Sequence, residues 1–406
     1  MKKGLLSTYF NGVAVKRLSA VEADPRRSHQ HEFAGGHLRN MFGEDDRKDI
    51  SAQFIWLNDE QEGLSEPGVV TWYDARKKQP HRNPEYRLYY AENPVASLMK
   101  EGDSFFVATR TDGTVMIIVV PKGSTVESQL VWLFGIEINS EDNFATNDKV
   151  DDSKLSFAAR YILDELGIDA EEPEIDQLEA LLEKYGTKFP TTLEFSDLAR
   201  ASLTEISAND DADAVLVSWL EREELLFRKL ERRIVSERLK SGFMSGDSAD
   251  VDGFIGFSLS VQNRRKSRAG HSLENHVKAL FDARGLKFER QAVTEGKSRP
   301  DFLFPGHKEY HNKAFKTERL TMLASKSTLK DRWRQVLDEA DRITHKHLLT
   351  FEPSISESQT DAMKNRNLQL VIPKALHTTY KDTQQMWLMD VAQFIKMVEE
   401  RQKNSE

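Results

Sequence analysis

The chain has 406 residues, of which 39% are hydrophobic and 30% are charged, and this length predicts two domain cores. The absence of cysteine excludes disulfides, cysteine-ligated zinc sites and a cysteine nucleophile, and it is consistent with a cytoplasmic protein. We expect no membrane span, because no run approaches the roughly 18 consecutive apolar residues that a spanning helix needs. We expect no targeting segment either, because Ser7 and Asn11 interrupt the apolar residues near the amino terminus.

The charge of the chain is distributed unevenly. The formal net charge of −9 counts, as a sum, against a nucleic-acid-binding protein, because DNA affinity rests largely on Lys and Arg at phosphates. Residues 164–183 are strongly acidic, however, whereas residues 264–268 are strongly basic. This segregation leaves room for a basic cleft on an acidic protein.

Residues 1–165 read mainly as strands. Several short runs are rich in β-branched and aromatic residues, and Thr111-Asp112-Gly113 between two of them is a hairpin signal. This spacing of short strands predicts a small barrel or sandwich. The predicted strands begin or lie at residues 13–18, 68–73, 105–110, 114–120 and 129–134.

The next part of the chain is predicted to be helical. Residues 166–185 are acidic, and Leu178, Leu181 and Leu182 have helical spacing, which indicates a linker with a helical piece. A helical zone begins near Lys188, and residues 214–239 have a helix-like period. The sequence therefore predicts an amino-terminal domain at 1–165, a linker at 166–185 and a carboxy-terminal domain at 186–406.

From Ser272 onward the predicted order is a helix, three strands, a helix and two strands. That order is typical of a mixed sheet covered by helices, so we expect an α/β domain. The predicted helices cover residues 272–285 and 331–343, and the predicted strands cover residues 287–293, 301–304, 320–324, 347–351 and 368–372.

Two residues in this domain point to phosphodiester hydrolysis. That reaction needs a metal held by carboxylate oxygens and a cation that orients water or neutralises developing charge. Asp301 starts a short apolar strand after Pro300, and Lys326 ends another. Strand ends that lie side by side would bring this carboxylate and ammonium together. Either residue taken singly is also compatible with an ordinary turn or a solvated lysine.

Two further carboxylates can complete such a site. We expect Glu274 in the first turn of the helix that begins at Ser272, from which it can reach the same sheet edge, although a charge at a helix start has a simpler explanation. We expect Glu339 on the helix that follows Lys326. The position two residues before the lysine, acidic in many nucleases, is Ala324 here.

Two charged segments are candidates for DNA contact. The alternation in Lys330-Asp331-Arg332 can read base edges, with cations on guanine acceptors and Asp on the cytosine amino group, whereas a capped helix start is the alternative. The cations Arg264, Arg265 and Arg268 suit phosphate contacts, whereas a solvated basic loop is the alternative. We interpret the histidine pair around Lys346, His345 and His347, as structural rather than metal-binding.

Taken together, these motifs resemble EcoRII-type (type IIE) restriction endonucleases of the PD-(D/E)XK nuclease superfamily. The similarity rests on residues 264–270, 272–274, 300–305, 326 and 330–335, which occur in the family's order and at similar spacing. The resemblance implies a restriction-endonuclease-like fold with a central mixed sheet and a catalytic set of Glu274, Asp301, Lys326 and Glu339. It also implies Mg²⁺ held by Asp301 and Glu274, and target reading by Lys330, Asp331 and Arg332.

The amino-terminal half shows a weaker resemblance to the same family. It rests on residues 15–20, 73–76 and 82–87. In that family this half is a B3-like pseudobarrel that binds a second, effector copy of the target site and covers the catalytic domain until DNA is bound. By position, Arg82, Glu85 and Arg87 would then contact effector DNA, although Pro84 is an insertion relative to the family.

The expected function is therefore a magnesium-dependent type II restriction endonuclease that cuts double-stranded DNA at a short G/C-flanked site. The resemblance implies a homodimer, a cognate DNA methyltransferase in the host and a role in defence against foreign DNA. A non-cleaving DNA-binding regulator on a nuclease scaffold is the alternative from a different class. A nuclease of the same fold that recognises DNA structure or modification is the third possibility.

Overall fold

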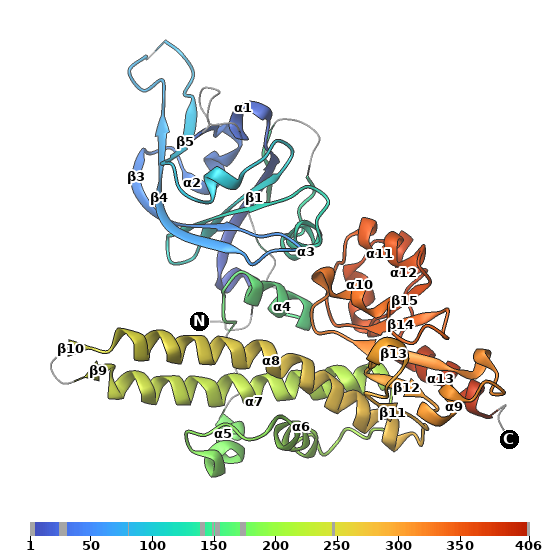
Figure 1. The fold of residues 1–406 in the computed structure, drawn as a ribbon. Coiled ribbons are helices and arrows are strands. Elements are labelled where there is room, and N and C mark those ends of the chain that lie inside the picture. Colours follow the sequence, from blue (N-terminus) through green and yellow to red (C-terminus); the bar gives the residue numbers. More distant parts are fainter. Residues whose placement is uncertain are drawn as a thin grey trace. The chain divides into compact units, whose positions relative to one another are not determined.

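The computed structural model describes residues 5–23, 31–79, 81–138, 143–147, 150, 155–170, 176–245 and 248–403, without the side chains at positions 176, 177, 245 and 331. The chain divides into two compact units (Figure 1). The first comprises Met1–Pro173 together with Pro353–Gln359, and the second comprises Glu174–Glu352 and Thr360–Glu406. The division between Pro173 and Glu174 falls inside the segment predicted as a linker. The return of Pro353–Gln359 to the first unit has no signal in the sequence.

The first unit is built on an eight-stranded sheet with the order β2-β5-β4-β3-β7-β6-β1-β8. Neighbouring strands are antiparallel except β3 and β7, which are parallel. The prediction of a strand-rich amino-terminal half is confirmed, including the turn between β6 and β7, where Gly113 has a φ of +84°. The strands are β1 (Phe10–Arg17), β2 (Glu32–Ala34), β3 (Arg47–Trp56), β4 (Leu64–Asp74), β5 (Tyr86–Tyr90), β6 (Ser104–Arg110), β7 (Val115–Val120) and β8 (Ala145–Asn147).

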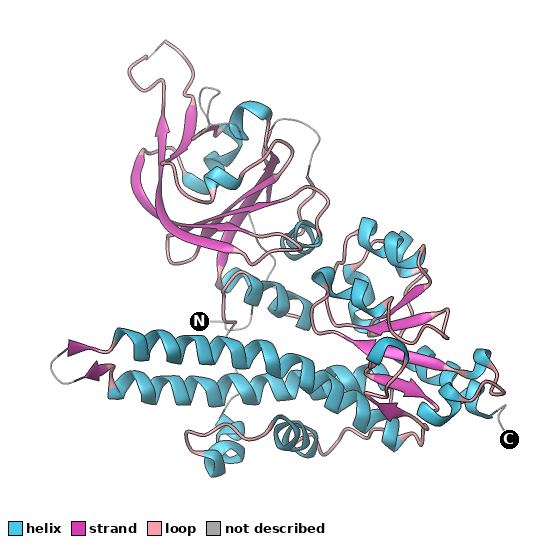
Figure 2. Cartoon of the chain, in the orientation of Figure 1, coloured by secondary structure: helices cyan, strands magenta, loops and turns pink. Residues whose placement is uncertain are grey.

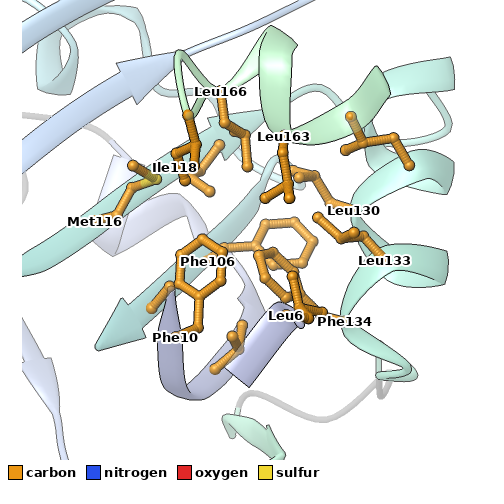
Figure 3. Packing of buried hydrophobic residues seen from close by; sticks show 14 of the residues in the cluster. Leu6, Phe10, Phe106, Met116, Ile118, Leu130, Leu133, Phe134, Leu163 and Leu166 are labelled. Carbon is orange, nitrogen blue, oxygen red and sulfur yellow. The ribbon is translucent and has the colours of Figure 1, made fainter. Parts of the chain in front are cut away.

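Both faces of the central strands are covered by apolar side chains. Along β7, Met116, Ile118 and Val120 contribute to one core, and the alternating residues Val115, Ile117 and Val119 contribute to the other. Because side chains in a strand alternate between faces, a strand buried on both sides must be apolar throughout, as β7 is. Figure 3 shows the first of these cores, where residues of β1, β6 and β7 meet helices α3 (Thr125–Phe134) and α4 (Phe157–Glu165).

The predicted strand at residues 129–134 is wrong, because these residues form most of helix α3. The side chain of Ser124 accepts a hydrogen bond from the backbone N–H of Glu127, which caps the helix, and Gly135 ends it in a left-handed conformation. Leu130, Leu133 and Phe134 then share one buried face. A short apolar run fits a buried strand and a buried helix equally well, and here the cap at Ser124 decides for the helix.

The second unit begins with helices. A capping box between Thr191 and Glu194 starts α6 (Thr192–Ala201), and Asp211 caps α7 (Ala212–Ser241). The helix α5 (Asp176–Leu182) lies in the segment predicted as a linker, yet its Leu178 and Leu182 are buried against Phe195 and Leu226 of α6 and α7. The prediction of a helical piece there is confirmed, and this piece packs within the second unit.

Helix α8 (Val251–Ala283) is much longer than the sequence predicted. It runs beside α7, to which the short strands β9 (Met244–Ser245) and β10 (Ser248–Ala249) connect it (Figure 1). The prediction that a helix opens at Ser272 is therefore wrong. Asp250 caps the true start by accepting a hydrogen bond from Gly253 N–H, and no proline interrupts the run that follows. Glu274 consequently lies in the body of α8.

The mixed sheet of the second unit has the order β11-β12-β13-β14-β15. The pairs β11–β12 and β12–β13 are antiparallel, whereas β13–β14 and β14–β15 are parallel. Figure 2 shows these strands among helices, so the predicted α/β arrangement is confirmed. The strands are β11 (Glu289–Arg290), β12 (Phe302–Phe304), β13 (Thr321–Ser325), β14 (Lys346–Leu349) and β15 (Leu368–Val371), and the helices after them are α9 (His307–His311), α10 (Trp333–Val336), α11 (Glu357–Lys364), α12 (Asp382–Gln385) and α13 (Val391–Lys403).

Two predicted elements are shorter than expected. The strand predicted over residues 287–293 is reduced to β11, because Gln291 has a φ of +51° and leaves the extended conformation. The helix predicted over residues 331–343 is reduced to a 3-10 turn at Lys330–Arg332 followed by α10. Ala340 has a φ of +50°, which is incompatible with a continuous right-handed helix. In the described part of the chain, no helix is both long and apolar enough to cross a membrane.

Candidate active site

The carboxylate of Asp301 is held at the edge of the mixed sheet. Since β12 and β13 are antiparallel, with Phe302 opposite Leu323, the start of β12 lies beside the end of β13. Asp301 Oδ2 accepts hydrogen bonds from Ser325 N at 2.7 Å and from Lys326 Nζ at 3.3 Å. Its other oxygen, Oδ1, accepts a hydrogen bond from Gln291 Nε2 at 2.9 Å. The predicted meeting of Asp301 and Lys326 is thus observed.

Lys326 is fixed by the parallel side of the same sheet. Its backbone N–H donates to Leu349 O on β14 at 3.0 Å, which continues the β13–β14 ladder by one residue beyond β13. Ala324, at the position that is often acidic in nucleases, is completely buried in the middle of β13. A carboxylate at position 324 would therefore be buried in the sheet, and a further carboxylate must come from elsewhere.

Glu339 supplies such a carboxylate, although it lies in a turn after α10 and not on the predicted helix. Burial raises its pKa to about 7, Lys326 and Lys346 lower the pKa, and the negative charge of Asp301 raises it. Glu339 therefore lies within electrostatic reach of Asp301 and Lys326. Its Oε2 atom is buried and has no hydrogen-bond partner among the described residues, so this oxygen can bind a ligand without first breaking a contact.

Glu274 lies on α8, and its carboxylate is already paired. Arg290 Nη2 donates to Glu274 Oε2 at 2.6 Å, and the same guanidinium lies over the Phe302 ring, with its carbon 5.7 Å from the ring centroid. Because Phe302 directly follows Asp301, these contacts place Glu274 beside the start of β12. The structure thus brings Asp301, Lys326 and Glu339 together, with Glu274 at the periphery.

The residues present fit a magnesium site. Mg²⁺ commonly binds proteins through one or two carboxylates and completes its coordination with water and substrate phosphate oxygens. Asp301 and Glu339 provide two carboxylates within electrostatic reach of each other, and the buried Oε2 of Glu339, which has no hydrogen-bond partner among the described residues, is the observation that favours a ligand there. Within the described ranges, no group of three or more His, Cys, Asp and Glu residues could hold a metal by itself. A metal here would consequently rely on substrate oxygens and water.

Sequence reasoning missed two residues of this site. Gln291 binds both the side chain and the backbone carbonyl of Asp301, at 2.9 and 3.3 Å, and its left-handed backbone turns it toward that residue. Arg290 neutralises Glu274. Both residues lie in the segment predicted as an ordinary strand, which ends at Arg290 because Gln291 has a left-handed backbone.

The proposed base readers follow Lys326 directly. Lys330 has a φ of +36°. The backbone N–H of Leu329, the residue before it, donates to the buried carboxylate of Glu352, and this hydrogen bond holds the segment between Lys326 and Lys330. Arg332 is exposed. The side chain of Asp331 lies outside the described residues. The first of these positions, Lys330, is four residues after Lys326 in the chain.

Two of the three arginines in the basic segment of α8 form ion pairs with glutamates of α7. Arg265 pairs with the buried Glu231 at 2.5 Å, and Arg268 lies 3.5 Å from the fully buried Glu223 and also pairs with Glu224. Arg264 is exposed, and its guanidinium carbon lies 4.4 Å from the centroid of the Phe189 ring. The predicted alternative of a basic loop is wrong, because these residues are helical. Arg264 is exposed and the side chain of Arg265 is 42% exposed despite its ion pair, whereas the side chain of Arg268 is only 12% exposed.

In the first unit, two of the predicted effector-contacting residues, Glu85 just before β5 and Arg87 on β5, belong to an ion-pair network. Arg87 pairs with Glu85, and its Nη1 lies 3.3 Å from Glu32 Oε2. Arg76 pairs with the other oxygen of Glu85. The hydrogen bond from Arg87 holds the pKa of Glu85 below its usual value. Arg82 is exposed in the turn before β5 and donates to Gln79 Oε1 at 3.1 Å.

The comparison with protein families finds a match within the second unit. Residues 227–395, which include Glu274, Asp301, Lys326 and Glu339, match the family described as EcoRII C terminal. This part of the chain is similar to EcoRII C-terminal domains. The chain is 39% identical over 230 residues to the type II restriction enzyme EcoRII of Escherichia coli, covering 56% of this chain and 55% of that protein.

Other proteins match this chain over a shorter segment or with lower identity. The type II restriction enzyme SsoII of Shigella sonnei is 31% identical over 126 residues, covering 28% of this chain and 40% of that protein. The chain thus spans about half the length of the curated relatives it matches. A complex of the restriction endonuclease PspGI with substrate DNA has a TM-score of 0.44 at 14% identity, over 58% of this chain and 100% of that one. Metal-depleted Ecl18kI in complex with uncleaved DNA has a TM-score of 0.42 at 20% identity, over 57% and 86%.

Proposed function

We propose that this protein is a magnesium-dependent, site-specific endonuclease of double-stranded DNA, of the type II restriction class. The observation that carries the proposal is the pairing of Asp301 with Lys326 at adjoining strand ends, with the unpartnered carboxylate oxygen of Glu339 beside them. The relatives support it, because EcoRII and SsoII are type II restriction enzymes. The natural role of such an enzyme is defence against foreign DNA, next to a methyltransferase that protects the host.

Each site residue has a role that follows from its contacts. Asp301 and Glu339 would hold Mg²⁺, with Glu274 as a third carboxylate once Arg290 releases it. When bound, the metal polarises the scissile phosphate and lowers the pKa of its water. Lys326 keeps its ammonium 3.3 Å from Asp301, where it can orient the attacking water and stabilise negative charge on the phosphate. Gln291 and the Ser325 N–H keep Asp301 in place.

The DNA-contacting roles follow from charge and position. Lys330, Asp331 and Arg332 would read G·C pairs in the major groove, since cations suit guanine acceptors and Asp suits the cytosine amino group. Arg264 would contact phosphate, with Arg265 and Arg268 adding positive potential from within their ion pairs. A short duplex target with G·C pairs at both ends favours a homodimer, because two-fold symmetry in the protein then matches that of the DNA.

The first unit would be a B3-like effector-binding domain that inhibits the catalytic domain until a second DNA site is bound. Its cations Arg82 and Arg87 lie on or next to β5, and Glu85 holds the guanidinium of Arg87 in a fixed direction. Fixed guanidinium groups beside a carboxylate are suited to base-edge recognition. A cytoplasmic location would accompany this role, because the DNA to be cut is there.

A plasmid digest tests the catalytic part of the proposal. Supercoiled plasmid is incubated with the full chain, with and without Mg²⁺, and the fragment ends are sequenced. We expect discrete fragments with a common terminal sequence, only when Mg²⁺ is present. Specific binding with no cleavage at any Mg²⁺ concentration would instead identify the non-cleaving regulator. Cleavage only of modified or structured DNA would identify the third candidate.

The effector part has a separate test. A fragment starting at residue 174, which keeps α5 with the second unit, is compared with the full chain on linear DNA that carries one target site. We expect the fragment to cut this substrate readily and the full chain to need added duplex with a second site. Equal dependence of both proteins on the added duplex would contradict inhibition by the first unit.

A further inference from the structure

The turn that carries Glu339 is held by a buried lysine on the next strand. Lys346 is the first residue of β14, and its side chain is only 7% exposed. Its Nζ donates a hydrogen bond to Leu337 O, the carbonyl that follows the last residue of α10. A cation at a helix carboxy terminus is favourable because the terminal carbonyls carry partial negative charge. Lys346 thus binds the carboxy-terminal end of α10, where the turn with Glu339 begins.

The surroundings of the Lys346 ammonium are acidic. Burial lowers the pKa of Lys346, and four carboxylates oppose this effect: Asp341, Glu339 and Asp338 from the turn after α10, and Glu295 from the segment before β12. Glu339 in turn is influenced by both lysines, Lys326 and Lys346, each of which lowers its pKa. A buried ammonium with a backbone acceptor and several carboxylates around it is suited to fixing a loop of negative charge.

The remaining anchors of this turn act at its far end. Tyr310 OH accepts a hydrogen bond from Arg342 N–H at 3.1 Å and donates one to Glu295 at 2.5 Å. The Arg342 guanidinium donates to the carbonyls of Tyr310 and Asn312. Glu339 lies between these contacts and the Lys346 contact at Leu337. Without Lys346, the described hydrogen bonds would leave the side of the turn that precedes Glu339 attached only through α10.

We propose that Lys346 is a positioning residue of the nuclease site, which fixes the turn after α10 so that the Glu339 carboxylate stays beside Asp301 and Lys326. This inference rests on the proposed function for its activity readout. Lys346 itself touches neither DNA nor the reacting atoms, and acts through Glu339. Removal of its ammonium leaves Leu337 O without that donor. It also removes a positive charge that acts on the Glu339 carboxylate.

A double-mutant cycle in the full chain tests the proposal. Single-turnover cleavage and half-saturating Mg²⁺ are measured for the unmodified protein, Lys346→Met, Glu339→Gln and the double variant. We expect Lys346→Met to lower the rate or the metal affinity about 10- to 100-fold, as second-shell changes at metal sites do. In the Glu339→Gln background the same change should add less than about 3-fold, because residues that act as a unit are not additive. Full additivity would overturn the proposal.

Three controls separate positioning from general damage. Lys396→Met removes an exposed lysine from α13 and should leave the rate and the metal dependence unchanged. Lys346→Arg retains the cation and a donor, and should recover most of the loss seen in Lys346→Met. DNA affinity without metal should stay within about 3-fold for every variant. A Lys346→Met protein that loses DNA binding as well would contradict a role confined to Glu339.

Hydrogen exchange gives a reading that does not depend on cleavage. The amide of Glu339 donates to Val336 O at 3.2 Å, and the amide of Asp338 donates to Gln335 O at 3.3 Å. We expect faster exchange of these amides in Lys346→Met and unchanged exchange in Glu339→Gln. Unchanged exchange in Lys346→Met would overturn the positioning role, even if the unmodified protein proved not to cut DNA. Absence of cleavage with the expected exchange pattern would overturn only the proposed function.

Discussion

The carboxylate of Asp301 and the ammonium of Lys326 lie 3.3 Å apart, although 25 residues separate them in the chain. The antiparallel pairing of β12 with β13 produces this contact, because the first strand begins where the second ends. The Ser325 N–H donates to the same carboxylate oxygen. The geometry of the pair is therefore set mainly by the backbone of the sheet.

Lys326→Met tests the role of the ammonium. We expect single-turnover cleavage to fall by about a hundred- to ten-thousand-fold, the range typical of a lost catalytic proton-transfer or charge-stabilising group. Specific DNA binding, measured by gel shift in a chelator, should change by less than about 3-fold. Retention of cleavage within 10-fold of the unmodified protein would remove Lys326 from the catalytic set.

Glu339 and Glu274 should differ in their importance for metal binding. Glu339 has a buried oxygen without a partner among the described residues, whereas Arg290 already neutralises Glu274. We therefore expect Glu339→Gln to raise the Mg²⁺ concentration for half-maximal cleavage by more than 10-fold, and Glu274→Gln to raise it less. The measurement is a Mg²⁺ titration of single-turnover cleavage for both variants. A larger increase for Glu274→Gln than for Glu339→Gln would show that Glu274 is the main carboxylate that binds the metal together with Asp301.

The raised pKa of Glu339 predicts that the stability of the protein depends on pH. Its folded-state pKa of about 7 lies above its ordinary value of 4.5, so the folded protein holds the Glu339 proton more tightly than the unfolded chain does. Its contribution to stability is fully present below pH 4.5 and is lost as the pH rises to about 7. In a chelator, Glu339→Gln should therefore be more stable than the unmodified protein at pH 8, by about 1–3 kcal/mol.

This difference should shrink toward pH 5, and thermal unfolding of both proteins at several pH values measures it. A constant difference between pH 5 and pH 8 would show that the pKa of Glu339 is not raised. Mg²⁺ should reduce the advantage of the variant at pH 8, since it compensates the negative charge of the ionised carboxylate.

Helix α8 predicts different effects for two of its arginines. Arg268 is only 12% exposed and pairs with Glu223, whose side chain is fully buried, so Arg268→Met should cost about 3–5 kcal/mol of stability. Arg264→Met should cost little stability and should weaken DNA binding with a reduced salt dependence. Thermal unfolding and binding at two salt concentrations measure these effects. A large loss of affinity in a fully stable Arg268→Met protein would restore the phosphate role first assigned to it.

Local patterns predicted much of the fold. Residue type and spacing predicted the hairpin at Thr111-Asp112-Gly113, the helix α7 and the strands β13, β14 and β15. The strand at residues 129–134 was wrong because Ser124 caps a helix whose buried face is as apolar as a strand. The ten-residue strand β3 carries charged residues at its start and was not predicted.

The candidate active site was also predicted only in part. Asp301 and Lys326 follow from strand ends, which sequence patterns indicate well. Glu339 was assigned to the site but to the wrong element, because α10 ends at Val336 and the left-handed Ala340 prevents a continuous helix beyond it. Gln291 was missed because its contacts depend on a left-handed backbone at a polar residue with no glycine to signal it, and Arg290 was missed because its partner Glu274 lies on a distant helix.

The most direct test of the account is the Asp301→Asn variant, which keeps the size of the side chain and removes its negative charge. Plasmid cleavage in Mg²⁺ and specific binding of a target duplex in a chelator are measured side by side. We expect cleavage to fall below detection, with binding retained within about 3-fold of the unmodified protein. Cleavage by Asp301→Asn at a rate close to that of the unmodified protein would contradict the assignment of the active site.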